Sequence, residues 1–286
     1  MRPYLEIVID ILSHGTFKEN RTGIGAYTLP GMMFKHDMKH GFPLLTTKYV
    51  PIKLVSSELE GFIKGITDKK WFQDKNNHVW DSWCNPKKVK YGHDIETKKK
   101  MFKENDLGPI YGAQWRAFDK NSLRDGIDQL KNVIETLKTN PNDRRMIVSA
   151  WNPQQLSSMA LPPCHYSFQV TVDKGYLNLA WNQRSVDVAL GLPFNIASYA
   201  LLLLLFCAET GYKPGYLIGF LMDTHIYENH VDGLKEQTMR EPKELPRLHI
   251  KGKEGAKNFC MLDWESEDIC LIGYKHSPKI NFEIAV

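Results

Sequence analysis

Two segments of this chain carry apolar residues at the spacing of an amphipathic helix. In residues 1–13 they are Leu5, Val8, Ile9 and Leu12. In residues 122–137 they are Leu123, Ile127, Leu130 and Ile134. Positions three and four apart share one face of a helix, so both segments are predicted to be helices with one buried face. Residues 196–210 are apolar almost throughout and precede Gly211, which predicts a buried helix that ends at the glycine.

Three shorter segments carry the pattern of strands. Residues 146–150 and 166–172 are short and rich in β-branched and aromatic residues. Residues 176–181 alternate between apolar and polar positions after the turn residues Asp173-Lys174-Gly175. The three are predicted to be consecutive strands. Because strands and helices mix without a regular βαβ alternation, the sequence predicts an α+β fold.

Nothing in the sequence divides it into parts. No repeat, low-complexity linker or shift of composition separates one region from another. With 42% hydrophobic and 24% charged residues over 286 positions, the composition is that of an ordinary globular protein. We therefore expect a single domain over residues 1–286.

Charge and hydropathy argue against several classes of protein. The first apolar segment contains Glu6 and Asp10, unlike a signal peptide, and the most apolar run, residues 200–208, is shorter than the about 20 residues that cross a bilayer. We therefore expect a cytoplasmic protein without a membrane partner. The net charge of +4 is too small to indicate nucleic-acid binding. The lysine-rich segment 87–103 is interpreted as a solvated excursion.

The cysteines do not form a recognisable framework. They are Cys84, Cys164, Cys207, Cys260 and Cys270. No two lie close in sequence and none has metal-ligand spacing, so neither a disulfide scaffold nor a metal site is expected. Reduced thiols agree with a cytoplasmic location.

Chemically useful side chains concentrate in residues 160–199. This region opens with ALPPCH and closes with NQRSVDVALGLPFNIASY. It combines a thiol, an arginine, a carboxylate, a Gly-Leu-Pro turn and an asparagine, which suits covalent chemistry on a phosphorylated heterocycle. A lone cysteine is more often a small buried apolar residue, so the thiol by itself does not make Cys164 a nucleophile.

The motifs of the whole chain resemble those of the thymidylate synthase family. Around the thiol they are Pro163-Cys164-His165, Gln183-Arg184-Ser185, Asp187-Val188, Leu190-Gly191-Leu192-Pro193-Phe194-Asn195 and Asp223-Thr224-His225-Ile226-Tyr227. Upstream they are Arg21-Thr22-Gly23, GFPLLTTK (41–48), Trp80-Asp81, GPIYGAQWR (108–116) and DRRMIVSAWNP (143–153), and at the end Ile284-Ala285-Val286. The resemblance implies a mixed sheet with surrounding helices, one face of the sheet forming a homodimer interface.

The resemblance implies folate-dependent transfer of a one-carbon unit to C5 of dUMP. Position C5 is a poor nucleophile until a thiolate adds to C6, and Cys164 matches that nucleophile. A thiolate needs positive charge nearby, for which Arg184 is the best candidate. The phosphate dianion suits arginine forks. The family resemblance assigns to the substrate Arg21, Arg144, Arg145, Arg184, Ser185, Gln183 and His165. Arg144 and Arg145 are expected to cross from the partner subunit of an obligate homodimer.

Further resemblance assigns the base, the sugar and the proton transfers. Asn195 matches the residue that reads O4 and N3 of uracil, although an amide turned over would present the opposite pattern to cytosine, so its surroundings must fix it. His225 and Tyr227 match the pair for the sugar hydroxyl and share one face if their segment is a strand. Glu58 matches the general acid and base, and Tyr111 the tyrosine associated with removal of the C5 proton.

The co-substrate implied is 5,10-methylenetetrahydrofolate. The residues that resemble its wall are Trp80, Trp83, Asp187, Leu190, Gly191 and Phe194, of which Asp187 also counts with the catalytic set. An aromatic and aliphatic stripe is otherwise more often core. Lys48 is expected to meet the glutamate tail, and Ala285 belongs to the C-terminal segment expected to close over the loaded site.

Several positions depart from the family pattern. Glu58-Leu59-Glu60-Gly61 replaces a common Glu-Leu-Leu-Trp, Asn182 replaces a common tyrosine, Leu221-Met222 replaces glycines and Pro51 a histidine. The first two resemble the deoxynucleotide hydroxymethylase branch. If Glu60 and Gly61 admit and orient a water, the product is 5-hydroxymethyl-dUMP. The retained Trp80 and C-terminal segment favour hydride transfer and dTMP, the outcome we favour, and Glu60 has no role if it points to solvent.

A protein of the same family that binds nucleotides without turnover is the remaining alternative. When a family member loses its activity, the catalytic residues are expected to be lost first. Because Cys164, Glu58, Tyr111, Asp187 and Asn195 are all present, we favour an enzyme over a scaffold.

Overall fold

The computed structural model describes residues 1–20, 23–121, 123–251 and 259–283. Eight α-helices are present in this part of the chain: α1 Arg2–His14, α2 Ile52–Ile63, α3 Lys69–Asp74, α4 Ile95–Lys103, α5 Tyr111–Ala117, α6 Gln129–Thr139, α7 Gly191–Thr210 and α8 Val231–Thr238. Short 3-10 turns lie at Met38–His40, Leu156–Ser158, Glu228–His230 and Ser266–Asp268.

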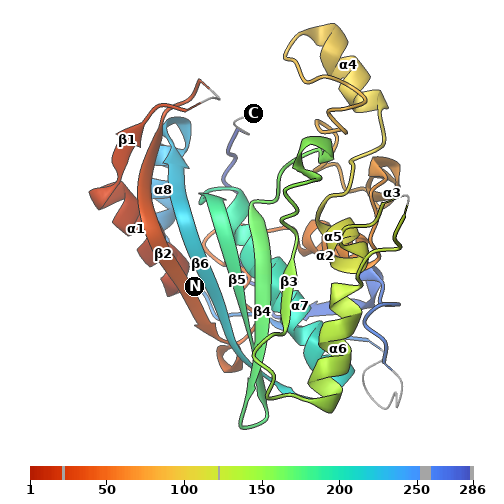
Figure 1. The fold of residues 1–286 in the computed structure, drawn as a ribbon. Helices are drawn as coiled ribbons and strands as arrows, with labels where there is room; N and C mark the ends of the chain where they lie inside the picture. Colours follow the sequence, from red (N-terminus) through yellow and green to blue (C-terminus); the bar gives the residue numbers. More distant parts are fainter. Residues whose placement is uncertain (21–22, 122, 252–258, 284–286) are drawn as a thin grey trace.

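A six-stranded mixed sheet forms one side of the molecule (Figure 1). Its strands, in spatial order, are β1 Thr16–Lys18, β2 Ala26–Asp37, β6 Lys213–Tyr227, β5 Tyr176–Asp187, β4 His165–Asp173 and β3 Ile147–Ser149. Strands β5 and β6 pair in parallel and all other neighbours pair antiparallel. A separate two-stranded ribbon joins β7 Arg247–Ile250 to β8 Ile269–Ile272. The α+β prediction is confirmed.

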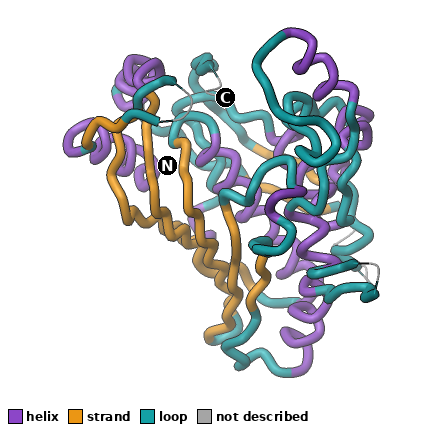
Figure 2. The backbone as a smooth tube through the Cα atoms, turned by 45° about the horizontal axis from the view of Figure 1, so that its top comes forward, coloured by secondary structure: helices purple, strands orange, loops and turns teal. Residues whose placement is uncertain are grey.

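Most helices cover one face of the large sheet (Figure 2). The long strands alternate accordingly: in β6, Leu217 and Leu221 are buried, whereas Phe220 and Met222 are exposed. The buried face packs against α7, whose side chains form the centre of the core. The opposite face leaves large apolar side chains at the surface.

Helix α7 confirms the buried helix predicted before Gly211. It begins five residues earlier than expected, at Gly191, and ends where Gly211 takes a left-handed conformation with φ 80°. Its 20 residues are long and apolar enough, by length and composition, to cross a membrane. The short length of the apolar run at residues 200–208 therefore does not exclude a membrane-spanning helix. Most of its side chains are instead buried within the protein.

The helix predicted over residues 122–137 is wrong in its first half. Leu123 and Ile127 are exposed, at 90% and 56%. Gly126 takes φ 84°, a left-handed conformation that interrupts a helix. Helix α6 begins after Asp128, whose carboxylate accepts the Lys131 N–H at 3.0 Å as an N-cap.

The N-terminal helix and the three strands agree with prediction, with small changes. In α1 the buried face is Tyr4, Leu5, Ile7, Val8 and Ile11. Ile9, expected on that face, is 47% exposed because the stripe passes through Ile7 and Ile11 instead. The strands predicted over 146–150, 166–172 and 176–181 are β3, β4 and a longer β5, adjacent in the sheet.

Candidate active site

A cavity of about 430 Å³ lies where the sheet meets α2, α5 and the start of α7. It gathers most of the residues predicted from the motifs. These are Glu58, Trp80, Trp83, Tyr111, Cys164, His165, Gln183, Ser185, Asp187, Leu190, Gly191, Phe194, Asn195, His225 and Tyr227. Residues distant in sequence thus converge on one hollow of small-molecule size.

Cys164 lies immediately before β4, and both its backbone N–H and its backbone carbonyl are hydrogen-bonded. Its N–H donates to the Tyr111 hydroxyl oxygen at 2.9 Å, and its carbonyl accepts from the Arg184 N–H at 2.9 Å. The Arg184 guanidinium donates to the carbonyls of Pro163 and Pro162 at 2.9 and 2.8 Å and lies over the Trp151 ring. Arg184 therefore braces the loop that carries the thiol and does not line the cavity.

The rings beside the thiol remain neutral at physiological pH. Burial raises the pKa of Tyr111 well above its usual value, an effect strengthened by nearby Cys164. His165 stacks on Tyr111 with ring centres 4.2 Å apart, and its Nδ1 is 2.9 Å from the Tyr199 hydroxyl. Burial lowers the pKa of His165 to about 3. Both groups therefore act here as neutral hydrogen-bonding partners.

Glu58 projects from α2 into the cavity and meets an indole. Its Oε1 accepts from the Trp80 Nε1 at 3.0 Å. Burial raises the pKa of Glu58 to about 7, and the bond from Trp80 opposes this only in part. A carboxyl with a pKa near the working pH can both give and take a proton, as a general acid and base must.

The Asn195 amide is held by a chain of hydrogen bonds that begins on β5. Asn195 Oδ1 accepts from Gln183 Nε2 at 3.0 Å. The same Gln183 nitrogen donates to the Ser185 carbonyl at 3.1 Å, and Gln183 Oε1 accepts from the Trp181 indole N–H at 3.0 Å. The surroundings needed to fix the Asn195 amide are therefore present.

Two further elements complete the wall. Asp187 Oδ1 accepts the backbone N–H groups of Ala189 and Leu190, at 2.9 and 3.1 Å, and so shapes the turn into α7. His225 and Tyr227 both lie on strand β6 and both line the cavity, with their rings edge to face at 5.1 Å.

The predicted cations lie elsewhere. Lys48 is buried, donates to the Ala189 carbonyl and lies over the Phe282 ring, and burial lowers its pKa to about 8. Arg144 and Arg145 are exposed just before β3, with Arg145 bound to Asp143 at 3.0 Å. These three do not line the cavity of their own chain, and Arg21 and Ala285 lie outside the described residues.

The structure corrects both alternatives for Glu60. Its side chain is 1% exposed, so it does not point to solvent, and it does not line the cavity. Its carboxylate binds Lys64 at 2.7 Å, Lys75 at 3.0 Å and the Ser266 N–H at 2.9 Å. Gly61 opens no channel either, because the space that a side chain would occupy there is filled by Phe72.

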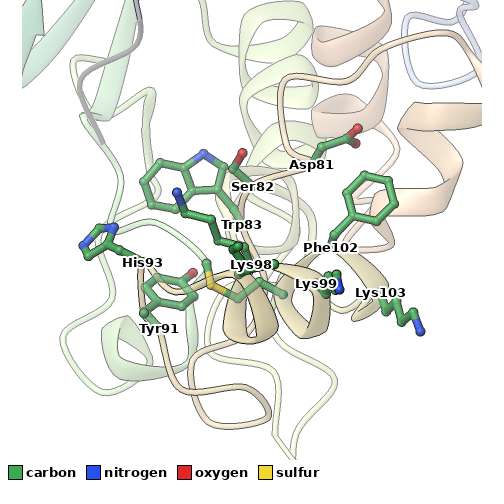
Figure 3. Close-up of a pocket in the computed structure, with 12 residues that line it drawn as sticks. Asp81, Ser82, Trp83, Tyr91, His93, Lys98, Lys99, Phe102 and Lys103 are labelled. Atoms are coloured by element: carbon green, nitrogen blue, oxygen red, sulfur yellow. The ribbon is translucent and has the colours of Figure 1, made fainter.

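The lysine-rich segment stands away from the sheet as an excursion that carries α4 (Figure 1). It encloses a second cavity, of about 620 Å³, with Trp83 at its centre between His93 and Tyr91 on one side and Phe102 on the other (Figure 3). Trp83 lines the first cavity as well, so its indole lies between the two, whereas Asp81 lines only the second.

Some residues of the site were not predicted. Phe62, Val79 and Leu161 line the first cavity. Trp181 and Tyr199 support it from behind through Gln183 and His165. Helical and strand periodicity contained the signal, because Phe62 lies four residues after Glu58, Tyr199 four after Asn195 and Trp181 two before Gln183.

Comparison with known families agrees with this geometry. The family model described as Thymidylate synthase matches residues 2–286, essentially the entire chain. The protein is accordingly a transferase that acts on C5 of dUMP with a reduced folate as co-substrate. The chain belongs to the thymidylate synthase family.

Proposed function

We propose that this protein makes dTMP and dihydrofolate from dUMP and 5,10-methylenetetrahydrofolate, as a cytoplasmic thymidylate synthase. The observation that carries the proposal is the single cavity in which Cys164, Tyr111, Glu58 and Asn195 meet. Together they offer a nucleophile, a neutral phenol, an acid and base, and a reader of the pyrimidine edge.

The first step belongs to Cys164. Its thiolate adds to C6 of dUMP, and the electron pair of the C5–C6 bond moves toward O4, so that C5 becomes nucleophilic. Glu58, with a pKa of about 7, exchanges protons near O4. Tyr111, neutral and hydrogen-bonded to the Cys164 N–H, positions the water that takes the C5 proton. Cys164 leaves when the product forms.

The other wall of the cavity fits a flat folate ring. It combines the indoles of Trp80 and Trp83 with the side chains of Leu190, Phe194 and Val79. These residues would hold the pterin by stacking and would exclude water. The carboxylate of Asp187 lines the same cavity. When bound, 5,10-methylenetetrahydrofolate supplies both the one-carbon unit and the hydride.

Hydride transfer is favoured over addition of water by two observations. Glu60 is engaged by Lys64 and Lys75 outside the cavity, so its carboxylate does not orient a water there. The Trp80 indole is fixed over the site by Glu58. The alternative is dUMP 5-hydroxymethylase, for which Asn182 remains the supporting departure, although its amide donates to Ser167 on the outer face of the sheet.

We propose a homodimer built on the uncovered face of the sheet. Phe220 and Met33 are register partners there and are 49% and 56% exposed, and Met222 is 62% exposed. Apolar surface of this kind is costly in a monomer. The exposed Arg144 and Arg145, outside the cavity of their own chain, suit the phosphate site of a second copy.

Product analysis tests the reaction. The purified protein is incubated with dUMP and 5,10-methylenetetrahydrofolate, the nucleotide product is identified by mass and the folate product by absorbance. Thymidylate with dihydrofolate supports the proposal. Formation of 5-hydroxymethyl-dUMP with tetrahydrofolate establishes the alternative. If neither dTMP nor 5-hydroxymethyl-dUMP forms, the protein is a binding scaffold.

Subunit complementation tests the shared site. Cys164→Ser and the double variant R144A/R145A are expected to be inactive separately. A mixture refolded together is expected to regain activity, because one heterodimer site combines an intact thiol with intact arginines. No recovery, with light scattering showing dimers, would place the arginines outside the site.

A further inference from the structure

Trp181 is the residue behind the base-reading amide. It lies on β5 two positions before Gln183, so both side chains point to the buried face of the sheet. Asn195 and Tyr199 are four apart on α7 and so share one face of that helix. The two pairs meet as Trp181 on Tyr199, with ring centres 5.2 Å apart and planes within 5°, and Gln183 on Asn195.

The indole is held firmly in this position. Trp181 is fully buried. Its register partner on β6 is Gly219, where a Cβ atom would lie 2.4 Å from the Trp181 ring, so only glycine leaves room for the indole. The indole N–H therefore has one fixed direction, toward Gln183 Oε1.

The chemical types of the groups set the direction of the chain. An indole N–H can only donate, and the Ser185 carbonyl can only accept. With Trp181 at its oxygen and Ser185 at its nitrogen, the Gln183 amide has one permitted orientation. Its nitrogen then donates to Asn195 Oδ1, which leaves the Asn195 NH₂ for a ligand.

We infer that Trp181 is a positioning residue that makes the cavity select uracil over cytosine, an inference that rests on the proposed function. Uracil presents an acceptor at O4 and a donor at N3, which match the Asn195 NH₂ and the second lone pair of Oδ1. Cytosine presents a donor at position 4 and an acceptor at N3, which require the amide turned over. Turning it over sets the NH₂ groups of Asn195 and Gln183 against each other.

Trp181→Phe tests this role, because it keeps an aromatic ring on Tyr199 and removes only the donor and part of the ring. The matched control is Trp264→Phe, because Trp264 is also buried but its N–H meets no acceptor among the described residues. Dissociation constants of dUMP and dCMP are measured by calorimetry for both variants and the wild type, with melting temperatures recorded alongside. Gly219→Ala, which displaces the indole without removing its N–H, is a second variant.

The expected result is a change of selectivity. Loss of one net hydrogen bond should lower the dUMP over dCMP preference roughly threefold to tenfold in Trp181→Phe, and not in Trp264→Phe. A merely structural role would weaken both nucleotides equally and leave the ratio unchanged, which would overturn the inference. A wild type that binds neither nucleotide would overturn the proposed function itself. If Trp181→Phe does not fold, an unchanged ratio in Gly219→Ala overturns the inference.

The second cavity is a separate and independent feature. Its floor is apolar and aromatic, formed by Trp83, Tyr91, Met101 and Phe102. The Tyr91 hydroxyl contacts the carbonyls of Cys84 and Ala160, so the floor is anchored to the body of the protein. Phe102 is 54% exposed, and the hollow it borders leaves that apolar surface uncovered.

Lysines predominate around this floor, although the carboxylate of Asp81 also lines the cavity. Segment 87–103 carries seven lysines against two acidic residues. Lys98 and Lys103 line the cavity and, among the described residues, form no ion pair, whereas Lys99 is bound to Glu96 at 3.2 Å. Beneath the floor the buried Lys69 ammonium donates to the carbonyls of Asp81, Trp83 and Met101 at 3.3, 3.1 and 2.8 Å. Its charge adds to the positive potential of the hollow.

We propose that this cavity binds a flat aromatic anion, distinct from the two substrates of the first cavity. The aromatic floor stacks the ring, and Lys98 and Lys103 meet its carboxylate or phosphate groups. A volume of about 620 Å³ suits a ligand of that size. Because Trp83 lines both cavities, an occupant would press on the folate wall.

Calorimetry with two probes tests the site and the source of the anion. ATP represents an aromatic phosphate and p-aminobenzoylglutamate an aromatic carboxylate. The variant K98E/K103E is compared with the control Lys131→Glu, because Lys131 is an exposed lysine on α6 that does not line the cavity. Binding of either probe that weakens at least tenfold in K98E/K103E and persists in Lys131→Glu supports the site and identifies its anion. No binding of either probe, or binding that K98E/K103E leaves unchanged, overturns it.

Discussion

Replacing Glu60 by leucine should destabilise the protein and leave its product unchanged. The carboxylate is 1% exposed and forms the centre of a small network in which Lys64 and Lys75 each contribute an ammonium and Ser266 a backbone N–H. This network ties α2 to Lys75, the residue that follows α3, and to the 3-10 turn at Ser266–Asp268. Glu60→Leu removes the common acceptor of all three groups.

The magnitude follows from what the substitution leaves behind. Removing one partner of a fully buried ion pair costs about 3–5 kcal/mol. Lys64 and Lys75 are 26% and 22% exposed, so both regain some water and the cost is lower. The Ser266 N–H loses its acceptor, which adds about 1–3 kcal/mol. We expect a loss of roughly 2–4 kcal/mol, or on the order of 5–10 °C in Tm.

The loss should also depend on pH. Burial alone would raise the pKa of Glu60, but the bonds from Lys64, Ser266 and Lys75 outweigh it and hold that pKa below its usual 4.5. A carboxyl with a lowered pKa stabilises the folded state above its unfolded value and loses that effect as pH falls through its folded value. The gap between wild type and Glu60→Leu should thus be full at pH 7 and shrink below about pH 4.5.

The assay is urea denaturation at pH 7 and at a pH below about 4.5, with product analysis at pH 7. Glu60→Gln is the control, because it keeps the size and an acceptor for the Ser266 N–H and should lose less stability. A Glu60→Leu protein of normal stability whose product ratio shifts toward dTMP would refute the reasoning and return Glu60 to the chemistry.

Three further predictions test the site and its packing. Cys164→Ser should abolish the covalent complex with 5-fluoro-dUMP and the folate, read by mass spectrometry, while dUMP binding persists; an intact complex would remove Cys164 from the mechanism. Glu58→Gln should lower kcat on the order of 10²–10⁴-fold. The pKa of Glu58 is raised to about 7 in the folded state, so the wild type loses stability as pH rises from 4.5 to 7. The free energy of unfolding of Glu58→Gln, measured with urea, should therefore exceed that of the wild type by about 1–3 kcal/mol at pH 8 but not at pH 4.5. An equal difference in stability at both pH values would contradict the burial argument. Gly61→Ala should cost about 1–3 kcal/mol, because its Cβ would lie 2.3 Å from the Phe72 ring, and Phe72→Leu in the same chain should recover most of it; failure to recover would show that the strain lies elsewhere.

The parts of the fold that the sequence predicts are those set by local patterns. Helix α7 and its stop at Gly211 follow from an apolar run and one left-handed residue. Strand β4 follows from a short segment rich in β-branched and aromatic residues, and β5 from alternation after a turn in which Lys174 and Gly175 both take positive φ. Each of these depends on neighbours in sequence, so no knowledge of the tertiary structure is needed.

The long pair β2 and β6 was not predicted, for a tertiary reason. Its register joins residues 26–37 to residues 216–227, nearly two hundred positions away. In β6 the buried face carries, in order, Gly215, Leu217, Gly219 and Leu221, so that glycine and leucine alternate along it. The glycines break the apolar alternation because the neighbouring strand fills their space, at Gly219 with the Trp181 indole. Their presence makes sense only once the adjacent strand is known.

For Glu60, comparison with the family motif and the periodicity of the helix lead to different predictions. Motif comparison sets Glu60 beside Glu58 and suggests a second acid in the site. The periodicity of a helix predicts the opposite. Residues two apart lie about 200° apart around the helix axis, whereas residues four apart lie on the same face. With Glu58 in the cavity, Phe62 must follow it there and Glu60 must face away, as the structure has them. A departure from a family pattern thus bears on chemistry only where the period of its element turns it toward the site.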